Sequence, residues 1–320
     1  MQVVIGSGPV GSTIATLLAE QGHAVRLITR SGRGPQHALI ERHALDASDA
    51  PALAAATTDA TVIYNAANPG SYATWGTVWP PLAASMLDAA RATGATLAIV
   101  GNLYAYGPVD RPMTEDLPLA STEKKGMLRA KMWTDALAAH DRGEIRALEV
   151  RASDYIGAGG ISHPGRAAGL LAKGKKVSVI GSLDQPHTWT ASLDTARLIV
   201  AAAADPNAHG RAWHVPSNPA RTQRELVRDL AAAAGLPEPA MSAMPHALVR
   251  AVGLVLPQMR EVAAMTYQFD QPFVLDDSQA RAHFGLEPTP WAELLRTTMA
   301  AALATVSPGS RPAPEQQASN

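Results

Sequence analysis

The residues near the start of the chain are the first whose types and spacing predict a particular chemistry. Gly6, Gly8 and Gly11 form a G-x-G-x-x-G pattern between an apolar run and a helical pattern. Gly6 allows a tight turn, Gly8 lets the backbone approach a pyrophosphate, and Gly11 lets the helix pack closely on the strand. Pro9 and Val10 lie where the turn enters the helix and are expected beside the cofactor, because free N–H groups and the helix dipole at a helix N-terminus favour phosphate. This segment therefore predicts a dinucleotide-binding turn.

The end of the next apolar run bears on which dinucleotide is bound. Arg30 and Arg33 could pair with a 2′-phosphate, and Thr29 or Ser31 could donate hydrogen bonds to it. The loop has no acid to accept from a 2′-hydroxyl, which favours NADP over the alternative, NAD. Solvated surface arginines are the other interpretation. Asp46 is expected near the adenine, or else as a solvated loop residue.

These motifs require a framework of strands and helices, which the apolar pattern predicts. Short apolar runs alternate with helical patterns through the first half of the chain, which predicts a Rossmann-like, doubly wound parallel sheet in an α/β protein. Strands are expected at Val3–Ile5, Ala24–Ile28, Thr61–Asn65, Thr96–Val100 and Ile145–Val150, and helices at Val10–Gln21, Leu82–Thr93 and Lys125–His140.

The rhythm changes after about residue 160. We expect a dinucleotide-binding domain at 1–160, with a later strand and helix returning from about 175–205, and a smaller substrate-binding lobe at 161–306. The segment 307–320, rich in Pro, Ser and Gln, is predicted to be disordered. Short strands at Val177–Ile180 and Trp213–Val215 are expected to mix with helices at Asp194–Ala203, Thr222–Ala234 and Trp291–Leu303.

Composition argues against several classes of partner. The formal net charge of −1 gives no basic excess for nucleic acid, and the absence of cysteine excludes disulfides and thiolate metal sites. No apolar run reaches the roughly 18–20 residues that a transmembrane helix needs. The longest candidate, Ala247–Leu256, contains Arg250 and is expected to be a buried or pocket-lining helix. No signal peptide is expected, the histidines lack metal-ligand spacing, and we predict a cytoplasmic protein without a bound metal.

At this point the chain resembles a known family, the extended short-chain dehydrogenases/reductases of the NAD-dependent epimerase/dehydratase group. The resemblance covers about residues 1–305 and implies that Ala66 and Ala67 lie beside the cofactor. It also implies a homodimer formed through two helices. The glycine turn departs slightly, since the family more often has G-x-x-G-x-x-G. Beyond that turn, the resemblance is carried by Tyr64–Ala67, Ile99–Pro108, Glu115–Pro118 and Arg151–Gly157.

The catalytic set of that family is a Ser or Thr followed by Tyr-x-x-x-Lys on the next helix. Carried over, these positions fall on Asn102, Met127 and Lys131, so only the lysine remains. The resemblance implies that Lys131 holds the nicotinamide ribose. Methionine has no exchangeable proton, but Asn102 can still donate a hydrogen bond to a substrate oxygen.

Three interpretations of the missing tyrosine stay open. Another group supplies the proton, with Tyr104 preferred over Tyr106, Tyr155 and Asp154 because it lies two residues past Asn102. Packing beneath the loop is the competing role for Tyr104, and Tyr106 is assigned packing. Alternatively, the enzyme reduces an activated C=C or iminium bond for which solvent supplies the proton. The third interpretation is an NADP-binding protein that performs no turnover.

On the substrate side, the resemblance places an arginine that clamps diphosphate where this chain has His187. Neutral imidazole is a poor replacement for that clamp, which argues against a nucleotide sugar. Met127, Asp154, His187 and Trp189 are the expected substrate contacts, although ordinary packing explains His187 and Trp189 equally well.

The leading hypothesis is an NADP-dependent oxidoreductase acting on a small, largely apolar carbonyl, enone or imine. The alternatives are an isomerase or lyase that retains NADP, and a non-catalytic NADP-binding regulator.

Overall fold

The computed structural model describes residues 1–157, 162–244, 248–249, 252, 261 and 263–306. The expected tail at 307–320 lies outside the described residues, and so does most of the helix expected at 247–256. In the described part of the chain, no helix is long and apolar enough to cross a membrane.

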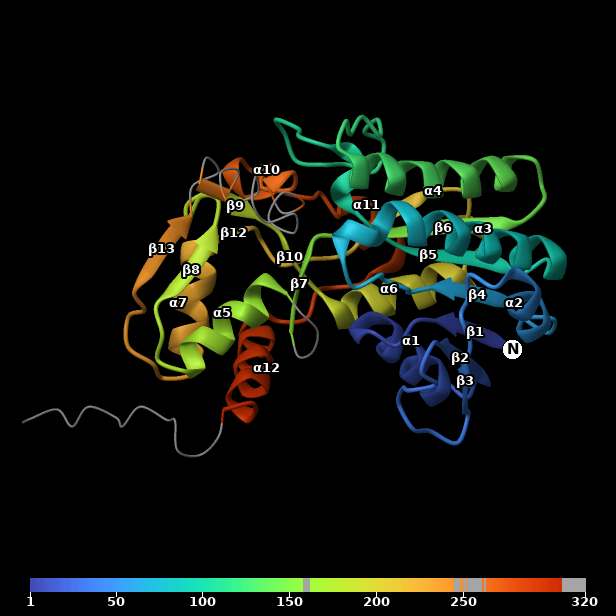
Figure 1. Cartoon of the computed structure of the whole chain (residues 1–320), viewed down its shortest axis with the longest axis horizontal. Coiled ribbons are helices and arrows are strands. Elements are labelled where there is room, and N and C mark those ends of the chain that lie inside the picture. The colour runs from blue at the N-terminus through green and yellow to red at the C-terminus, as the bar shows by residue number, and fades with distance from the viewer. Residues whose placement is uncertain (158–161, 245–247, 250–251, 253–260, 262, 307–320) are drawn as a thin grey trace, which may run out of the picture.

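A seven-stranded sheet forms the centre of the larger part of the molecule, with the strand order β11-β6-β5-β4-β1-β2-β3 (Figure 1). All neighbouring pairs are parallel, and the order reverses between β1 and β4. A reversal of this kind opens a crevice at the carboxyl ends of the strands, where α/β proteins bind ligands. The predicted doubly wound α/β fold is therefore confirmed. The strands are β1 (Gln2–Ile5), β2 (Val25–Thr29), β3 (Ile40–Ala44), β4 (Val62–Asn65), β5 (Thr96–Asn102), β6 (Arg146–Ala152) and β11 (Ala212–His214).

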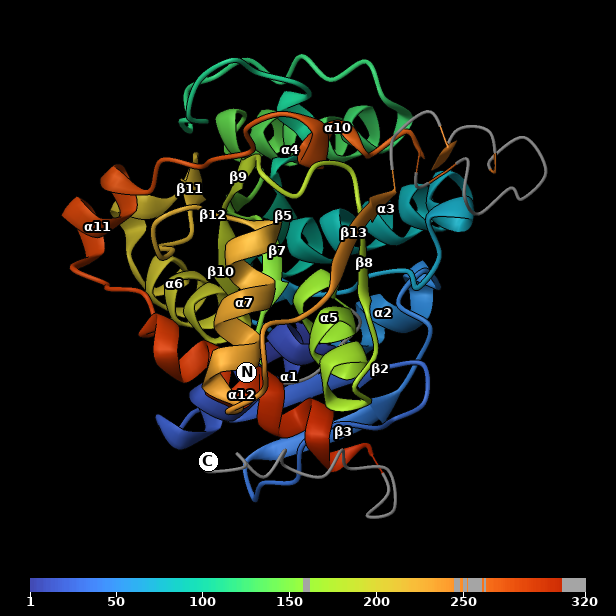
Figure 2. The ribbon, with the colours of Figure 1, turned by 90° about the vertical axis from the view of Figure 1, so that its left-hand side faces the viewer.

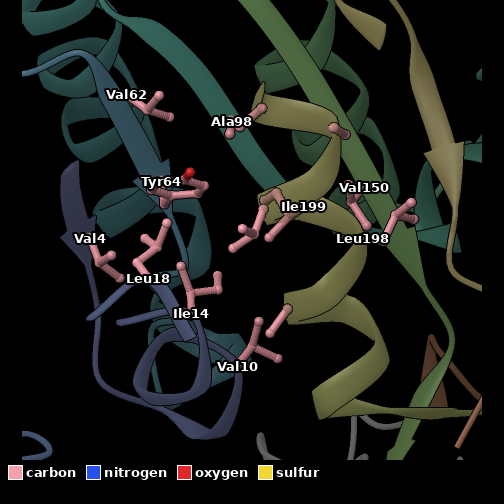
Figure 3. Close-up of a cluster of buried hydrophobic side chains, with 14 of the residues drawn as sticks. Val4, Val10, Ile14, Leu18, Val62, Tyr64, Ala98, Val150, Leu198 and Ile199 are labelled. Carbon is pink, nitrogen blue, oxygen red and sulfur yellow. The ribbon is translucent and has the colours of Figure 1, made fainter. Parts of the chain in front are cut away.

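Helices α1 (Pro9–Glu20) and α6 (Ser192–Ala204) cover one face of this sheet. Proline at the first position of α1 starts the helix, because its fixed φ suits that position. The spacing of Val10, Ile14 and Leu18 then places all three on the buried side. Figure 3 shows them packing with Ile199 of α6 against strand residues. Burying a side chain of this size contributes about 1.5–3 kcal/mol.

Helices α2 (Ala50–Ala56), α3 (Trp75–Thr93) and α4 (Lys124–Asp141) cover the opposite face. Helix α3 begins at Trp75 and continues through Pro80 and Pro81, so the predicted start at Leu82 is wrong. Trp75 and Trp79, one turn apart, are both buried and hold this first part of the helix against the core. Burial of two indole rings outweighs the hydrogen bonds that the two prolines remove.

The smaller lobe has its own core, formed by helices α5 (His163–Ala172), α7 (Gln223–Ala233) and α12 (Trp291–Ala304) with short strands. Figure 2 looks onto this lobe, with its three helices in front of the central sheet. The strands form three pairs. These are β7 (Asp154–Ile156) with β10 (Trp189–Ala191), β8 (Val177–Ile180) with β13 (Met241–Met244), and β9 (Pro186–His187) with β12 (Arg221–Thr222).

The return of the chain to the central sheet differs from the expectation in one respect. Helix α6 packs against α1 and the sheet, whereas β8 pairs with β13 in the smaller lobe instead of returning. The strand that returns is β11, which pairs with β6. Only hydrogen-bond partners distinguish these two short apolar strands, and partners are set by tertiary structure. The remaining described elements are the 3-10 turns η1 (Tyr72–Thr74), η2 (Leu103–Tyr106) and η3 (Pro206–Ala208) and the helices α10 (Tyr267–Asp270) and α11 (Ser278–Phe284).

Candidate functional site

The glycine turn between β1 and α1 is closed on one side and open on the other. Gly6 has φ +104°, and a Cβ there would lie 2.6 Å from the carbonyl oxygen of Ala66 and 2.9 Å from the Cα of Ala67. A Cβ on Gly11 would collide with the carbonyl oxygen of Gly6. Gly8 is different, because no heavy atom of the described chain, apart from Gly8 and its two chain neighbours, lies within 4 Å of its Cβ position. The turn is thus packed against the end of β4 while its tip is bare.

The bare tip fits a phosphate group. Gly8 is the N-cap of α1 and provides no side-chain cap, so the first N–H groups of the helix are not occupied by a capping side chain. Pro9 occupies the first turn without donating, and Val10 faces the core. A pyrophosphate could approach the backbone at Gly8 without displacing any side chain. Ala66 and Ala67 form the neighbouring wall, as judged from their approach to Gly6.

The loop after β2 carries two exposed arginines. Hydrogen bonds from Thr29 Oγ1 to the carbonyl oxygen of Arg33 (3.2 Å) and from the Arg33 amide to Ser31 Oγ (3.4 Å) shape it. Neither Arg30 nor Arg33 forms an ion pair with an acid in the described ranges. Their charges therefore remain available to an anion.

Asp46 lies near this loop, since the charge of Arg30 contributes to its ionisation. Its Oδ1 accepts from the backbone amide of Ser48 at 3.0 Å and from the Ser48 hydroxyl at 2.7 Å. These hydrogen bonds, together with Arg30, lower the pKa of Asp46. The carboxylate thus stabilises its own loop through Oδ1, and Oδ2 accepts no hydrogen bond from the described residues.

The buried side of helix α4 does not include Met127 or Lys131. Met127 is 54% exposed, and the Lys131 side chain is 72% exposed with Nζ 2.9 Å from Asp135. Both side chains are therefore exposed in this structure, and the contact of Lys131 with the nicotinamide ribose stays a prediction. Buried positions of the helix are Lys125, Gly126, Arg129, Met132, Trp133, Ala136 and Ala139.

The buried basic residues of α4 lie two positions before Met127 and Lys131. Two residues rotate a helix position by about 200°, which moves it to the opposite side. Lys125 and Arg129 keep the four-residue spacing of the expected pair but lie on the core side. The sequence contained a signal for this: counting back from the apolar positions Met132, Trp133 and Ala136 places Arg129 and Lys125 on the buried stripe.

Lys125 is a buried cation at the start of α4. Its Nζ lies 2.8 Å from Glu261 Oε2, 3.6 Å from Glu123 Oε1 and 5.4 Å from the ring centroid of Tyr72. The next residue, Gly126, packs so closely on η2 that a Cβ would collide with the carbonyl oxygen of Tyr104. This close approach fixes the ammonium group beside the loops that follow β4 and β5.

Arg129 is a buried guanidinium with little direct hydrogen bonding. Its Cζ lies 5.0 Å from the ring centroid of Trp75 and 4.4 Å from that of Trp79. One nitrogen donates to the carbonyl oxygen of Val100 at 3.4 Å, whereas Nε has no partner among the described residues. No acid of the described chain pairs with it, and burial lowers its pKa. Donors thus remain available at the carboxyl end of β5.

Asn102 is the last residue of β5, and Tyr104 lies in the turn η2 that follows it. The Oδ1 of Asn102 accepts from the Tyr104 amide at 3.1 Å and caps η2, which leaves the side-chain NH₂ as a donor. The Tyr104 ring stacks on Trp75, with centroids 6.3 Å apart and an interplanar angle of 27°. Its hydroxyl lies 2.8 Å from the hydroxyl of Tyr72. Tyr104 therefore has both a packed ring and a polar end, and Tyr72 is a neighbour that the sequence did not suggest.

Burial keeps both phenols neutral. It raises the pKa of Tyr72 and raises that of Tyr104 well above the ordinary value near 10. Tyr106, in contrast, lies in a buried network in which its hydroxyl contacts His214 Nε2 at 2.7 Å and accepts from Arg151 at 2.5 Å. Two buried partners and a core position give Tyr106 a structural role.

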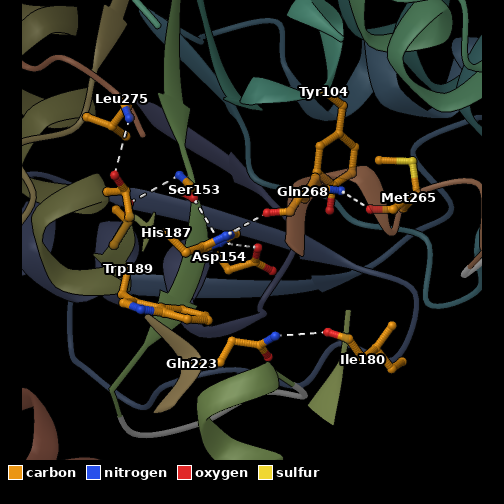
Figure 4. Close-up of polar contacts among 12 residues, drawn as sticks. Tyr104, Ser153, Asp154, Ile180, His187, Trp189, Gln223, Met265, Gln268 and Leu275 are labelled. Carbon is orange, nitrogen blue, oxygen red and sulfur yellow. Dashed lines mark hydrogen bonds and ion pairs between the residues drawn. The ribbon is translucent and has the colours of Figure 1, made fainter. Parts of the chain in front are cut away.

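Of the substrate-side residues, Asp154 alone combines a polar group with partial exposure. Its Oδ2 lies 2.9 Å from Nε2 of His187, and the two side chains are 18% and 1% exposed. Figure 4 shows the two side chains pointing toward one another, with Trp189 beside them. His187 stacks on Phe269 with centroids 4.7 Å apart. Trp189 is buried and donates to the carbonyl oxygen of Arg221, so His187 and Trp189 support the site from the core.

Asp154 also interacts electrostatically with three tyrosines. Its negative charge contributes to the raised pKa values of Tyr72, Tyr104 and Tyr267, which come from η1, η2 and α10. The structure thus brings Asn102, Tyr104 and Asp154 to the carboxyl edge of the sheet and adds Tyr72, Lys125 and Arg129. Among the described residues, no group of acids and histidines is arranged to hold a metal ion.

A doubly wound parallel sheet with a bare glycine turn at its first helix defines a nucleotide-binding protein of the Rossmann type. The sequence profile of the NAD dependent epimerase/dehydratase family matches residues 3–215, and the chain belongs to that family. Its membership and fold make it an NAD-binding enzyme of the epimerase/dehydratase type, as the resemblance implied.

Solved structures share the fold at low sequence identity. UDP-glucose 4-epimerase from Thermus thermophilus, complexed with NAD, is 18% identical with a TM-score of 0.77, over 96% of this chain and 100% of that one. dTDP-glucose 4,6-dehydratase from Bacillus anthracis str. Ames, also with NAD, is 15% identical with a TM-score of 0.78, over 95% and 97%. UDP-glucuronic acid 4-epimerase from Bacillus cereus is 16% identical with a TM-score of 0.78, over 96% and 100%. The search of curated protein sequences found no match.

Proposed function

We propose that this protein is an NADP-dependent oxidoreductase that transfers hydride to or from a small, largely apolar carbonyl, enone or imine. The observation that carries the proposal is the bare tip at Gly8 together with two exposed arginines, Arg30 and Arg33, that form no ion pair among the described residues. The tip suits a pyrophosphate, and the arginines suit a 2′-phosphate. A 2′-hydroxyl would instead be recognised by an acidic residue that accepts its hydrogen bond.

Residues at the carboxyl edge of the sheet would hold the rest of the cofactor and the substrate. The nicotinamide, when bound, supplies or accepts the hydride. Arg129 would take over the ribose contact that the resemblance placed on Lys131, because its guanidinium has unused donors at the end of β5. The free NH₂ of Asn102 would polarise the substrate oxygen, and Tyr104 would donate the proton.

The charges around the site argue for an uncharged substrate. Asp154 is the partly exposed group on the lobe side, and His187, in the position expected for a diphosphate clamp, is already engaged by that carboxylate. A carboxylate at this place would repel a diphosphate. Tyr72 and Tyr104, both partly exposed, rest on the buried Trp75 and present aromatic surface that suits a flat apolar molecule.

A second candidate function is an isomerase or lyase that retains NADP. Family membership favours it, since the solved structures named above are two 4-epimerases and a 4,6-dehydratase. The two candidates differ in cofactor balance: an oxidoreductase consumes NADPH in proportion to product, whereas an isomerase or lyase leaves its concentration unchanged.

The test is a fluorescence titration of the purified protein with NADPH and with NADH. We expect NADPH to bind at least about tenfold more tightly, and Arg30→Ala and Arg33→Ala to remove that preference. Arg142→Ala, which changes an exposed arginine at the end of α4, is the matched control and should leave both affinities unchanged. Binding of neither nucleotide would contradict the proposal. Tight NADPH binding without turnover of any carbonyl, enone or imine would favour a regulator instead.

A further inference from the structure

We propose that Tyr72 is a positioning residue that acts as a proton relay: it resupplies Tyr104 after Tyr104 has protonated the substrate oxygen, and Lys125 stabilises the intermediate charge. This inference rests on the proposed oxidoreductase function. It starts from the contact between the two hydroxyl oxygens, which lie 2.8 Å apart. Two hydroxyls carry two hydrogens, and only one of these lies in the shared bond. The other hydrogen is free to be donated to a third oxygen.

The two phenols are held in place by one indole ring. Trp75 lies edge-to-face against Tyr72, with centroids 5.0 Å apart, and stacks on Tyr104 at 6.3 Å. The Trp75 Nε1 donates to the carbonyl oxygen of Pro69 at 3.1 Å, which fixes the indole itself. A hydroxyl pair fixed in this way requires no reorganisation before a proton moves.

The charges around the pair support transient ionisation of Tyr72. The Lys125 ammonium lies 5.4 Å from the Tyr72 ring centroid, and Arg129 also favours the ionised phenol. Asp154 opposes ionisation of both tyrosines, and Tyr267 opposes that of Tyr104. Glu261 and Glu123 hold the Lys125 ammonium in place beside the Tyr72 ring. Burial, together with the charge of Asp154, raises the pKa of both phenols, which are therefore protonated at rest.

The proposed reduction balances in three steps. The carbonyl carbon gains a hydride from reduced nicotinamide while the π pair moves onto oxygen, and that oxygen takes the proton of the Tyr104 hydroxyl. The Tyr104 phenolate then takes the proton of the Tyr72 hydroxyl. The Tyr72 phenolate, stabilised by Lys125, recovers a proton from water. The net reaction consumes one carbonyl, one NADPH and one proton, and it yields one alcohol and one NADP⁺.

The experiment compares Tyr72→Phe and Tyr104→Phe with the wild type in the reduction of 9,10-phenanthrenequinone, cyclohexenone and a cyclic imine by NADPH. We expect Tyr104→Phe to lower kcat by about 100-fold or more and Tyr72→Phe by about tenfold, with KM and the NADPH Kd within about twofold. The proton inventory in H₂O/D₂O mixtures should be curved for the wild type, with more than one proton in motion, and linear for Tyr72→Phe. A purely structural role for Tyr72 would not change the shape of that plot.

Tyr64→Phe is the matched control, since Tyr64 is a buried tyrosine of β4 within the hydrophobic core; it should keep both kcat and the curved inventory. Lys125→Gln is the second variant and should lower kcat while leaving the inventory curved. Full kcat and a curved inventory in Tyr72→Phe would overturn the relay but leave the oxidoreductase proposal intact. Absence of any reduction by wild-type protein that binds NADPH would instead overturn the oxidoreductase proposal, and the relay with it.

Discussion

The carboxylate of Asp154 and the imidazole of His187 form a pair in which Oδ2 and Nε2 lie 2.9 Å apart, although 33 residues separate them in the chain. The other ring nitrogen, Nδ1, lies 3.1 Å from the carbonyl oxygen of Gln268 and therefore carries a hydrogen. Burial opposes ionisation of Asp154, but the hydrogen bond and charge of His187 outweigh it, and the pKa of Asp154 is lowered. The site thus keeps a carboxylate at its lobe side.

We expect Asp154→Asn to lower the free energy of unfolding by about 1–3 kcal/mol, because His187 is buried and loses its anionic partner. The stabilisation from this pair is present above the unfolded pKa of about 3.9 and is lost as pH falls through the lower folded pKa. Urea unfolding measures the change. Asp135→Asn, at the exposed partner of Lys131, is the control and should cost no more than about 0.5 kcal/mol. Equal losses in the two variants would contradict this account of the pair.

His214 makes stability depend on pH in the acidic range. Its side chain is fully buried, and burial lowers its pKa to about 4. The unfolded state, with a pKa near 6.5, binds the proton first, so stability is fully present above pH 6.5 and is lost as pH falls towards 4. The difference between these values corresponds to ~3 kcal/mol.

We therefore expect the wild type to lose about 3 kcal/mol more between pH 7.5 and pH 4 than His214→Asn, as measured by urea unfolding at several pH values. His23→Asn, at an exposed histidine, should lose as much as the wild type. Parallel pH profiles for the wild type and His214→Asn would show that His214 does not control this loss.

Two glycines of the turn are expected to have different roles, Gly6 in stability and Gly8 in cofactor binding. Gly6→Ala should lower the free energy of unfolding by at least about 1 kcal/mol, because φ is +104° and the Ala66 carbonyl oxygen lies 2.6 Å from the added Cβ. Gly8→Val should leave stability within about 0.5 kcal/mol, since the space at its Cβ is open among the described atoms, yet weaken NADPH binding at least about tenfold. Thermal unfolding and NADPH titration of both variants check this, and loss of stability in Gly8→Val would contradict it.

Helix α4 offers a matched pair of basic residues for the cofactor contact. Arg129→Lys keeps the charge but removes the guanidinium fork, and we expect it to weaken NADPH binding by about 1.5–3 kcal/mol. Lys131→Ala removes an exposed residue paired with Asp135 and should leave the affinity unchanged. Fluorescence titration measures both. The opposite order, in which Lys131→Ala binds NADPH more weakly than Arg129→Lys, would show that Lys131 contacts the nicotinamide ribose.

Local signals in the sequence were sufficient for much of the framework. The glycine turn at Gly6 and Gly11 was predictable because only glycine fits the backbone angle and the close approaches found there. The alternation of apolar runs and helical patterns predicted the parallel sheet, since a strand covered on both faces must be apolar along its whole length. Asn102 and Tyr104 were placed at the edge of the sheet by their position directly after an apolar strand.

Tertiary structure decided which side chains meet in the site. Helix α4 contains two pairs of residues spaced four apart, Lys125 with Arg129 and Met127 with Lys131. Packing of Met132 and Trp133 against the core places the first pair on the buried side of the helix and leaves the second pair exposed. Tyr72 lies 32 residues from Tyr104, and their contact depends on how the loop after β4 folds back onto Trp75. Motif spacing specifies the order of residues along one element. The rotation of a helix about its axis, and contacts between separate loops, are set by burial against neighbours that are distant in the chain.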